Sequence, residues 1–546
     1  MTADRSYRDL QEHIEALDAA GLLHRIDAPV NKDTQMHPLV RWQYRGGIEE
    51  PDRKAFLFTN VTDSRGRKYD IPVVIGALAG TAEIYRIGMD CDLADVGQKW
   101  SRAIANPIGP VEVTDAPCQQ VVMQGDALKG EGNGVDALPV PISTPGFDAG
   151  PYLTAATWIT ADPDDGVQNM GVYRGNLKAP DRIAVMMLIS LSAGGYYHWK
   201  KYKARGQKMP VCIVLGCPPA VEFTGPQKLQ MGQDELGVAG ALAGGPIHVV
   251  KAVTNDLRVP ADAEVIIEGL IDDEYLEPEG PFGESHGYVA LEEFNLVMQV
   301  TAITRKRAPV IPSIISQVTP SESSVIKRVA YEPLYLSHLR DTMSVKGVVR
   351  VSLHEPLTNL RRVVLVQFER GVAKTEIWRA LYGAASLQPA TGKYVIAINE
   401  DIDPENGDAV FWALGYRANP ALDVQILGHR ARGHGPVLKG VDSDSTMLID
   451  ATLKADMPPV ALPKEEFMLE AKALWEELGL PKLKPESPWH GYSLGDWSDR
   501  WEQMARRATD GDYLRNGEIT WQQRRKVAEP QTPIADVLDD VFGADD

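Results

Sequence analysis

The residues between about 115 and 318 contain a series of short runs rich in Val and Ile, and this series constrains the fold most. The runs are RIAVMML, PVCIVLG, IHVVKAV, AEVIIEG and LVMQVTAI, separated by Gly or Pro turns. β-Branched residues pack well on a pleated, half-buried surface, and glycine and proline mark the turns between strands. The region is therefore predicted to form a β-barrel or a β-sandwich.

The residues before this region predict an N-terminal α+β region spanning 1–114. Leu10, Ile14 and Leu17 recur at helical spacing over residues 6–20, Gly21 follows as a stop, and LLHRI then predicts a short strand. From about 54 to 110, short apolar runs such as AFLF and IPVVIG alternate with turn residues.

The residues after this region change pattern again. The strand-like runs VVRVSL, RRVVLVQF, KYVIAI and DVQIL alternate with helical TEIWRALYGAA and AVFWALGYR. Such alternation predicts an α/β layer domain with a parallel component, over residues 319–462. The last part, 463–546, begins with amphipathic EEFMLEAKALWEEL and is rich in Trp. Exposed aromatic residues often cover a neighbouring subunit, so it is predicted to be a helical oligomerisation tail.

Composition disfavours several classes of protein. With 546 residues the chain is long enough for two or three domains, and its net charge of -19 disfavours binding to nucleic acid or to an anionic membrane. Four cysteines are too few for a disulfide framework, and the N-terminus MTADRSYRDL lacks the apolar core of a secretory signal. We therefore expect a cytoplasmic protein.

Three segments carry polar residues of types that can bind a metal or an anion. Asn169 and Arg174 lie five residues apart just before a strand; an amide oxygen can ligate a hard cation, and an arginine can hold a carboxylate. His198 lies in the glycine-bearing loop GGYYHWKKY and could complete a metal site, although a lone histidine is more often structural. Glu235 heads the small-residue segment ELGVAGALAGGP, where a helix start alone would also favour a glutamate.

The sharpest motif is EGPFGESHGY, which places Glu279 and Glu284 around a Gly-Pro-Phe-Gly turn. A turn can aim both carboxylates inward, where different surroundings can divide acid and base roles between them. The alternative is a pair of solvated loop glutamates.

Taken together, NMGVYR, GGYYHW, DELGVAGAL, EVIIEG and EGPFGESHGY resemble the UbiD-like decarboxylases. The resemblance extends upstream through LPVPISTPGFDAGPYLT and downstream through GKYVIAINEDIDP and STMLIDATLK. It implies a mixed α/β (α+β) fold in which residues 115–318 form a split β-barrel, flavin-reductase-like domain that binds prenylated FMN (prFMN).

The resemblance also implies the site. The phosphate of prFMN would be held through a metal, Mn²⁺ or another divalent ion with K⁺ nearby, bound by Asn169, His198 and Glu235. The cofactor-binding residues that it implies are Thr154, Asn169, Gly171, Val172, Arg174, His198, Glu235 and Lys393. The catalytic residues that it implies are Arg174, Glu279 and Glu284, with Glu284 as the proton donor.

The implied reaction is the reversible, non-oxidative decarboxylation of an aromatic or α,β-unsaturated carboxylic acid, or an aromatic acyl-CoA, through a covalent adduct with prFMN. The implied partners are the acid, CO₂ and a flavin prenyltransferase that supplies the cofactor, and the implied assembly is a homodimer or homohexamer. Two other readings stay open at this point: a glycoside hydrolase using Glu279 and Glu284, and a non-catalytic assembly protein.

Overall fold

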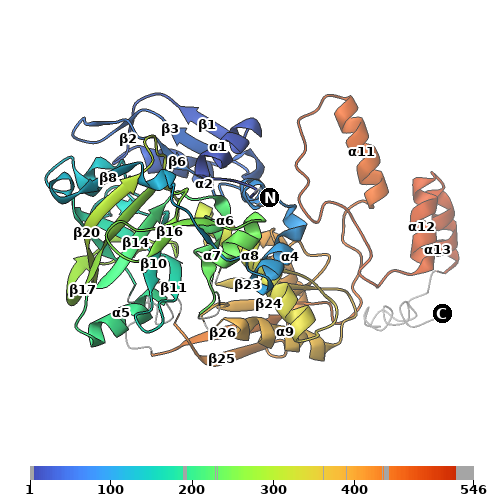
Figure 1. Ribbon diagram of the computed structural model, residues 1–546. Helices are drawn as coiled ribbons and strands as arrows, with labels where there is room; N and C mark the ends of the chain where they lie inside the picture. The colour runs from blue at the N-terminus through green and yellow to red at the C-terminus, as the bar shows by residue number, and fades with distance from the viewer. Residues whose placement is uncertain are drawn as a thin grey trace. The chain divides into compact units, whose positions relative to one another are not determined.

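The computed structural model describes residues 5–187, 194–227, 229, 232–360, 362–388, 390–432, 435 and 442–523. The chain forms two compact units (Figure 1). The first comprises Met1–Glu400 and Ala413–Thr452, and the second comprises Asp401–Trp412 and Leu453–Asp546.

The first hundred residues form a small α+β region. The predicted opening helix is α1, which begins after the N-cap Asp9, whose side chain accepts a hydrogen bond from Glu12 N; Gly21, at φ +71°, then lets the chain turn into β1. In its main sheet, β21 joins from much later in the chain, in the order β1-β3-β6-β21. The elements are α1 (Leu10–Ala19), β1 (Leu23–Ile26), β2 (Val30–Asn31), α2 (Met36–Arg45), β3 (Ala55–Phe58), β4 (Val61–Thr62), β5 (Lys68–Tyr69), β6 (Val73–Ile75), α3 (Ala82–Met89), α4 (Val96–Ala105) and β21 (Ile311–Ser313).

The strand-rich region forms a nine-stranded sheet, in the place predicted for the split β-barrel. Its order is β11-β10-β14-β17-β20-β13-β12-β9, with β8 also pairing β20. The run IHVVKAV is a strand as predicted but lies in a separate sheet, β16-β15-β7. The strands are β7 (Val111–Glu112), β8 (Val121–Gln124), β9 (Tyr152–Leu153), β10 (Ala156–Ala161), β11 (Gln168–Val172), β12 (Gly175–Ala179), β13 (Arg182–Val185), β14 (Met209–Leu215), β15 (His248–Lys251), β16 (Arg258–Pro260), β17 (Val265–Glu279), β18 (Phe282–Gly283), β19 (Val289–Ala290) and β20 (Glu293–Arg305).

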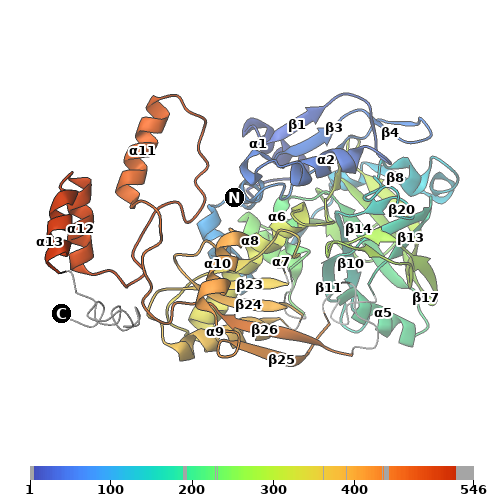
Figure 2. The ribbon, with the colours of Figure 1, turned by 180° about the vertical axis from the view of Figure 1, so that it is seen from behind.

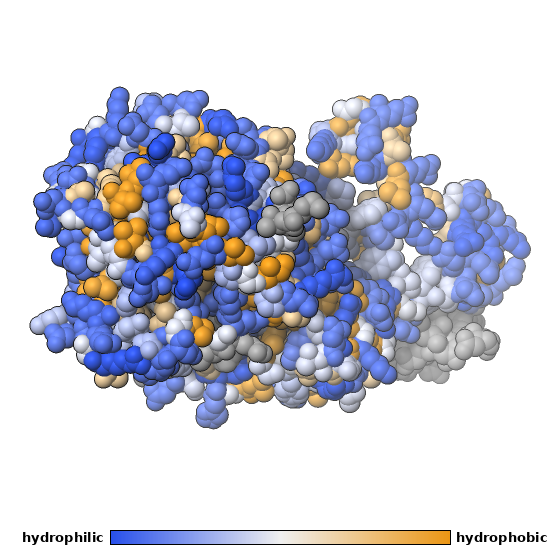
Figure 3. Space-filling view, in the orientation of Figure 1, coloured by the Kyte–Doolittle hydropathy of each residue, from blue (hydrophilic) through white to orange (hydrophobic). Residues whose placement is uncertain are grey.

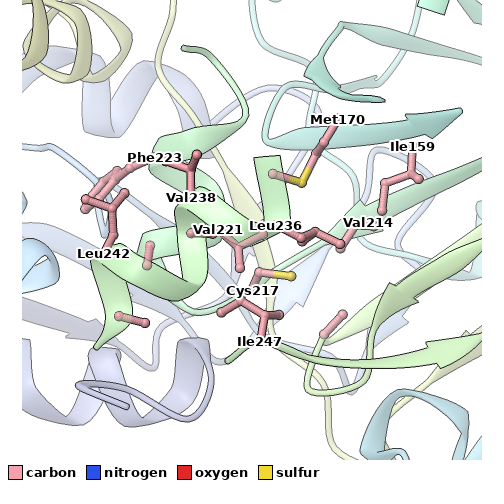
Figure 4. Packing of buried hydrophobic residues seen from close by; sticks show 14 of the residues in the cluster. Ile159, Met170, Val214, Cys217, Val221, Phe223, Leu236, Val238, Leu242 and Ile247 are labelled. Carbon is pink, nitrogen blue, oxygen red and sulfur yellow. The ribbon is translucent and has the colours of Figure 1, made fainter. Parts of the chain in front are cut away.

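Three helices of this region, α5 (Gly194–Ala204), α6 (Pro219–Thr224) and α7 (Glu235–Ala243), interrupt the run of strands. The core that fixes α6 and α7 to the sheet is shown in Figure 4, where Leu236, Val238 and Phe223 pack with Val214 and Met170 from the strands. This packing holds the first residue of α7 close to β11, because both elements contribute to one buried cluster.

The alternating region forms an α/β layer, as predicted. Its five-stranded sheet has the order β22-β23-β24-β26-β25, in which β23, β24 and β26 run parallel (Figure 2). The N-cap Ser321 starts α8, closing a capping box with Ser324. The elements are α8 (Glu322–Ser337), β22 (Val348–Leu353), β23 (Val363–Phe368), α9 (Lys374–Leu387), β24 (Tyr394–Asn399), α10 (Gly407–Arg417), β25 (Val424–Arg430) and β26 (Asp444–Asp450). These sheets and helices confirm the predicted mixed α/β class.

The second unit contains the predicted helical tail, with α11 (Glu465–Glu477), α12 (Asp499–Thr509) and α13 (Tyr513–Gln522). Helices α12 and α13 are joined by the hydrogen bond from Asn516 Nδ2 to Met504 O, 2.7 Å. Residues 524–546 of the predicted tail lie outside the described residues.

The face shown in Figure 3 is largely hydrophilic, with small groups of hydrophobic residues between. Within the part of the chain that the structure describes, every helix is too short or too polar to cross a lipid bilayer.

Candidate active site

The first unit contains a cavity of about 850 Å³ that is partly open to solvent. Strand β11, the starts of α5 and α7, the turn after β17 and one face of α8 contribute its walls. The volume lies in the range of small-molecule and cofactor sites, and most of the candidate residues from the sequence line it.

The turn after β17 carries the two candidate glutamates. Glu279 is the last residue of β17, the turn continues through the short pair β18 and β19, and the chain returns as β20. Two glycines are needed here. Gly280 adopts φ +100°, and a Cβ on Gly283 would collide with Thr144 Oγ1. The rigid turn predicted from the Gly-Pro-Phe-Gly sequence is present.

Arg174 joins both glutamates. Its guanidinium donates two parallel hydrogen bonds to Glu279, from Nε to Oε1 at 2.8 Å and from Nη2 to Oε2 at 2.7 Å. Its Nη1 donates to Glu284 Oε1. Glu279 is fully buried, whereas Glu284 lines the cavity. We call Arg174, Glu279 and Glu284 the paired cluster.

The surroundings of Arg174 keep it charged. Burial alone would lower its pKa, but the hydrogen bond to Glu279 and the charges of both glutamates raise the pKa above its ordinary value. The Phe282 ring centroid lies 5.0 Å from Arg174 Cζ, a cation–π contact. Asn295 Nδ2 donates to Glu279 Oε2 at 3.3 Å. The arginine is therefore held by two glutamates and an aromatic ring, and Asn295 in turn holds Glu279.

Three other candidates line the same cavity. Asn169 lies on β11, His198 on α5, and Glu235 is the first residue of α7. We call them the donor cluster. Within the described residues no three His, Cys, Asp or Glu side chains gather at one point, and the donor cluster has only two such side chains, with the Asn169 amide as the third.

Burial pushes the donor cluster toward its uncharged forms. It raises the pKa of Glu235 to about 7, although backbone N–H groups at the helix start and at Met170 oppose the rise. Burial also lowers the pKa of His198 below its ordinary value. Thr160 Oγ1 lies 2.9 Å from His198 Nδ1, so Nε2 is the ring nitrogen left for a ligand.

The donor cluster fits a divalent cation. It offers an amide oxygen, a neutral imidazole and a carboxyl, which are ordinary ligands for Mn²⁺. A Cβ on Gly194 would collide with the Asn169 side chain, so only glycine lets the start of α5 approach it this closely. A bound cation would also reverse the burial cost that raises the pKa of Glu235.

Of the remaining candidates, three line the cavity and one does not. Thr154, Gly171 and Val172 line the cavity, and Thr154 Oγ1 accepts a hydrogen bond from Ile314 N at 2.9 Å. Lys393 is outside the lining and forms an ion pair with Asp444. The predicted local structure around His198 was wrong: GGYYHWKKY is the helix α5, because Trp199 and His198 pack inward rather than facing solvent.

Three family models match the chain. They describe the N-terminal domain, the Rift-related domain and the C-terminal domain of 3-octaprenyl-4-hydroxybenzoate carboxy-lyase (UbiD), and they cover residues 14–104, 110–318 and 324–451. The chain belongs to the UbiD family. The family consists of decarboxylases, and this chain is one of its members, as the sequence motifs suggested.

Solved UbiD-class structures resemble the chain over most of its length. HmfF from Pelotomaculum thermopropionicum in complex with FMN is 28% identical, with a TM-score of 0.72 over 82% of this chain and 95% of HmfF. An evolved dimeric form of HmfF in complex with prFMN is also 28% identical, with a TM-score of 0.71 over 84% and 97%. The closed form of vanillic acid decarboxylase from Sedimentibacter hydroxybenzoicus is 25% identical, with a TM-score of 0.70 over 86% and 99%.

Sequence reasoning missed residues that complete the site. Asn295 lies on β20, and only the pairing of β20 with β17 brings it to Glu279. Glu222, on α6, lines the cavity while only 5% exposed, and burial raises its pKa to about 7. Its one signal in the sequence is a carboxylate within the otherwise apolar PPAVEF.

Proposed function

We propose that this chain catalyses the reversible decarboxylation of an aromatic or α,β-unsaturated carboxylic acid with prFMN. One observation carries the proposal. A buried arginine is held between two glutamates, one of which faces a cavity that is also lined by Asn169, His198 and Glu235, side chains of types that can ligate a metal.

The cofactor would lie between the two clusters. Asn169, His198 and Glu235 would hold its phosphate through Mn²⁺ or another divalent ion, with K⁺ nearby, and Thr154, Gly171 and Val172 would line its remaining surface. When bound, prFMN supplies the electron sink that loss of CO₂ from an sp² carbon requires. Lys393 would reach it only by leaving Asp444.

The paired cluster would handle the substrate and the proton. Arg174 orients the carboxylate that is lost, and Glu279 keeps the guanidinium fixed through two parallel hydrogen bonds. A substrate carboxylate that takes over Nη1 would release Glu284 from its ion pair, which favours the protonated form of Glu284. Glu284 then donates its proton to the carbon that has lost CO₂.

The glycoside hydrolase reading fits this geometry poorly. Two catalytic carboxylates would have to flank a sugar, roughly 5–10 Å apart. Here both bind one guanidinium and Glu279 is fully buried, so no glycosidic bond could pass between them.

The proposed partners are the acid, CO₂ and a flavin prenyltransferase, and the proposed assembly is a homodimer or homohexamer. The evolved HmfF structure is dimeric, which supports this. The 463–546 tail is proposed to contribute to the contacts between subunits.

The test is to produce the full chain together with a flavin prenyltransferase and with Mn²⁺ in the medium. We expect the intact mass and absorption spectrum of the bound cofactor to be those of prFMN, and a panel of aromatic and acrylic acids to yield CO₂. A folded, Mn²⁺-supplied protein that retains no flavin would contradict the proposal.

A further inference from the structure

The carboxyl group of Glu284 is oriented partly by the backbone of its own turn. Its Oε1 accepts a hydrogen bond from Arg174 Nη1, and its Oε2 accepts one from Ser285 N at 3.2 Å. The turn closes on itself, because Glu284 N donates to Tyr288 O at 3.0 Å and Gly287 N donates to Glu284 O at 3.0 Å. A shift of this backbone would therefore move the carboxyl group relative to the cavity.

A loop from much earlier in the chain, residues 144–149, binds this turn at two backbone positions. Asp148 Oδ1 accepts a hydrogen bond from Gly283 N at 2.9 Å, and Gly283 directly precedes Glu284. Ala149 N donates to Pro281 O at 3.1 Å. The first of these bonds joins residues 135 positions apart, so the loop supports the turn independently of the strands that flank it.

The second oxygen of Asp148 fixes the loop itself. Asp148 Oδ2 accepts a hydrogen bond from Thr144 N at 2.7 Å, and the Thr144 side chain lies where a Cβ on Gly283 would collide with it. Each carboxylate oxygen thus has its own backbone N–H donor, one in the loop and one in the turn. An asparagine could satisfy only one of them, because an amide has a single acceptor oxygen and its NH₂ group would face the other donor.

The surroundings of Asp148 indicate that it is kept for these backbone contacts. Asp148 is half-buried, and burial raises its pKa above the ordinary value, although the N–H groups of Gly283 and Thr144 oppose the rise. Among the residues that the structure describes, its partners include no lysine or arginine. Burying a carboxyl without a cation costs free energy, so the gain comes from the charge-assisted hydrogen bonds to the backbone.

We propose that Asp148 is a positioning residue for the proton donor: its carboxylate fixes the backbone at Gly283 so that the carboxyl group of Glu284 stays directed at the reacting carbon. Asp148 is not among the described residues that line the cavity, so it acts through the turn rather than on the substrate. The inference rests on the proposed function for the proton transfer by Glu284, whereas the attachment of the turn does not depend on any reaction.

The first experiment measures the kinetics of Asp148→Asn in the cofactor-loaded full chain, with an acid that the wild type decarboxylates. We expect kcat to fall about 10- to 100-fold, because a misplacement of about 1 Å can cost that much. KM should be unchanged, since Arg174 keeps both hydrogen bonds to Glu279, and flavin content should also be unchanged. Asp148→Ser removes the carboxylate without adding an amide donor, and it is a second variant with the same expectation.

A double-mutant comparison tests whether Asp148 acts through Glu284. Asp148→Asn is added to Glu284→Gln, and we expect the residual kcat to change by less than about twofold, since the group that Asp148 positions no longer delivers a proton. A general loss of structure would instead lower kcat by the same factor in both backgrounds, which would overturn the proposal.

The chain offers a matched control on strand β17. Asp272 also accepts two backbone hydrogen bonds, from Glu274 N at 2.8 Å and from Tyr275 N at 2.7 Å, but it lies at the other end of the residues joined to the turn. Asp272→Asn removes the same kind of carboxylate, so the melting temperature can fall. We expect its kcat and flavin content to stay at the wild-type level.

Hydrogen exchange tests the attachment without turnover, on the full chain, through peptides that span residues 280–291. Asp148→Asn should exchange about tenfold faster there, as expected for the loss of a hydrogen bond to a charged group, whereas Asp272→Asn should not. Unchanged exchange, unchanged kcat or loss of bound flavin in Asp148→Asn would each overturn the inference. Failure of the proposed function is a different result: the loaded wild type would release no CO₂, while the difference in exchange would persist.

Discussion

The two clusters of the cavity solve the problem of buried charge in opposite ways. In the paired cluster, Arg174 donates two parallel hydrogen bonds to Glu279 and one to Glu284, and the pKa of Arg174 is raised. In the donor cluster, burial lowers the pKa of His198 and raises that of Glu235 to about 7, with no cationic side chain among the causes for Glu235.

Because of this difference, the charges of the paired cluster are balanced within the protein, whereas we expect the donor cluster to need a bound ligand. The charges of the paired cluster are compensated without any added group, because each buried charge already has a partner of opposite sign. The donor cluster gains most from a cation, since the cation would restore the charged form of its glutamate. The predicted effects of mutation should therefore differ in kind between the two.

The largest effect is expected in the paired cluster, from Glu284→Gln. The amide keeps the shape of the side chain but has no acidic proton to deliver, so turnover should fall about 10²- to 10⁴-fold. Flavin content should stay at the wild-type level, because the donor cluster is untouched. Single-turnover kinetics with a saturating acid measure the loss, and unchanged turnover would contradict the role of Glu284.

A second change breaks the pairing itself. Glu279→Gln leaves the buried Arg174 with one carboxylate in place of two, and removing one partner of a buried pair costs about 3–5 kcal/mol. We expect a lower melting temperature as well as lower turnover. A variant that melts like the wild type would show that Arg174 does not need a second carboxylate beside Glu284.

The strands, the turn and the candidate residues of both clusters could be predicted from the sequence, but the contacts between these residues could not. The strand runs and the Gly-Pro-Phe-Gly turn are local patterns, and β17, β20 and the turn between them formed as predicted. The hydrogen bonds between Arg174 and Glu279 join residues 105 positions apart, and only the sheet brings them together. The helix around His198 was missed because its two glycines and aromatic residues give a weak helical pattern, which tertiary packing overrides.

The donor cluster should respond through cofactor retention rather than through chemistry. Asn169→Ala removes one ligand of the proposed metal, and we expect Mn²⁺-dependent flavin binding to weaken about 10- to 100-fold or more. The melting temperature of the metal-free protein should change little, because the amide is not part of a buried ion pair. Metal content by elemental analysis and flavin content by absorbance check this, and full retention of both would exclude Asn169 as a ligand.

The last and smallest effect concerns Glu222, and its measurement tests whether burial alone raises the pKa of a carboxyl in this cavity. Glu222 is another carboxyl of the cavity lining; its Oε1 accepts a hydrogen bond from Cys217 N at 2.7 Å, and burial raises its pKa to about 7. A carboxyl with a raised pKa in the folded state stabilises the protein fully below its unfolded pKa and loses that contribution as the pH rises through about 7.

Glu222→Gln should therefore melt like the wild type at acidic pH. At alkaline pH its free energy of unfolding should exceed that of the wild type, by at most about 3 kcal/mol, which corresponds to a pKa raised from 4.5 to about 7. Melting curves of the metal-free protein across this pH range measure the difference. Repeating the melting curves with Mn²⁺ and FMN tests whether Glu222 lies apart from the proposed metal. The pH-dependent advantage of Glu222→Gln should persist if Glu222 is apart from the metal, and it should vanish if the cation also compensates Glu222. A pH-independent difference would mean that Glu222 stays ionised in the fold, and that burial in this cavity is not enough to hold a proton on a carboxyl.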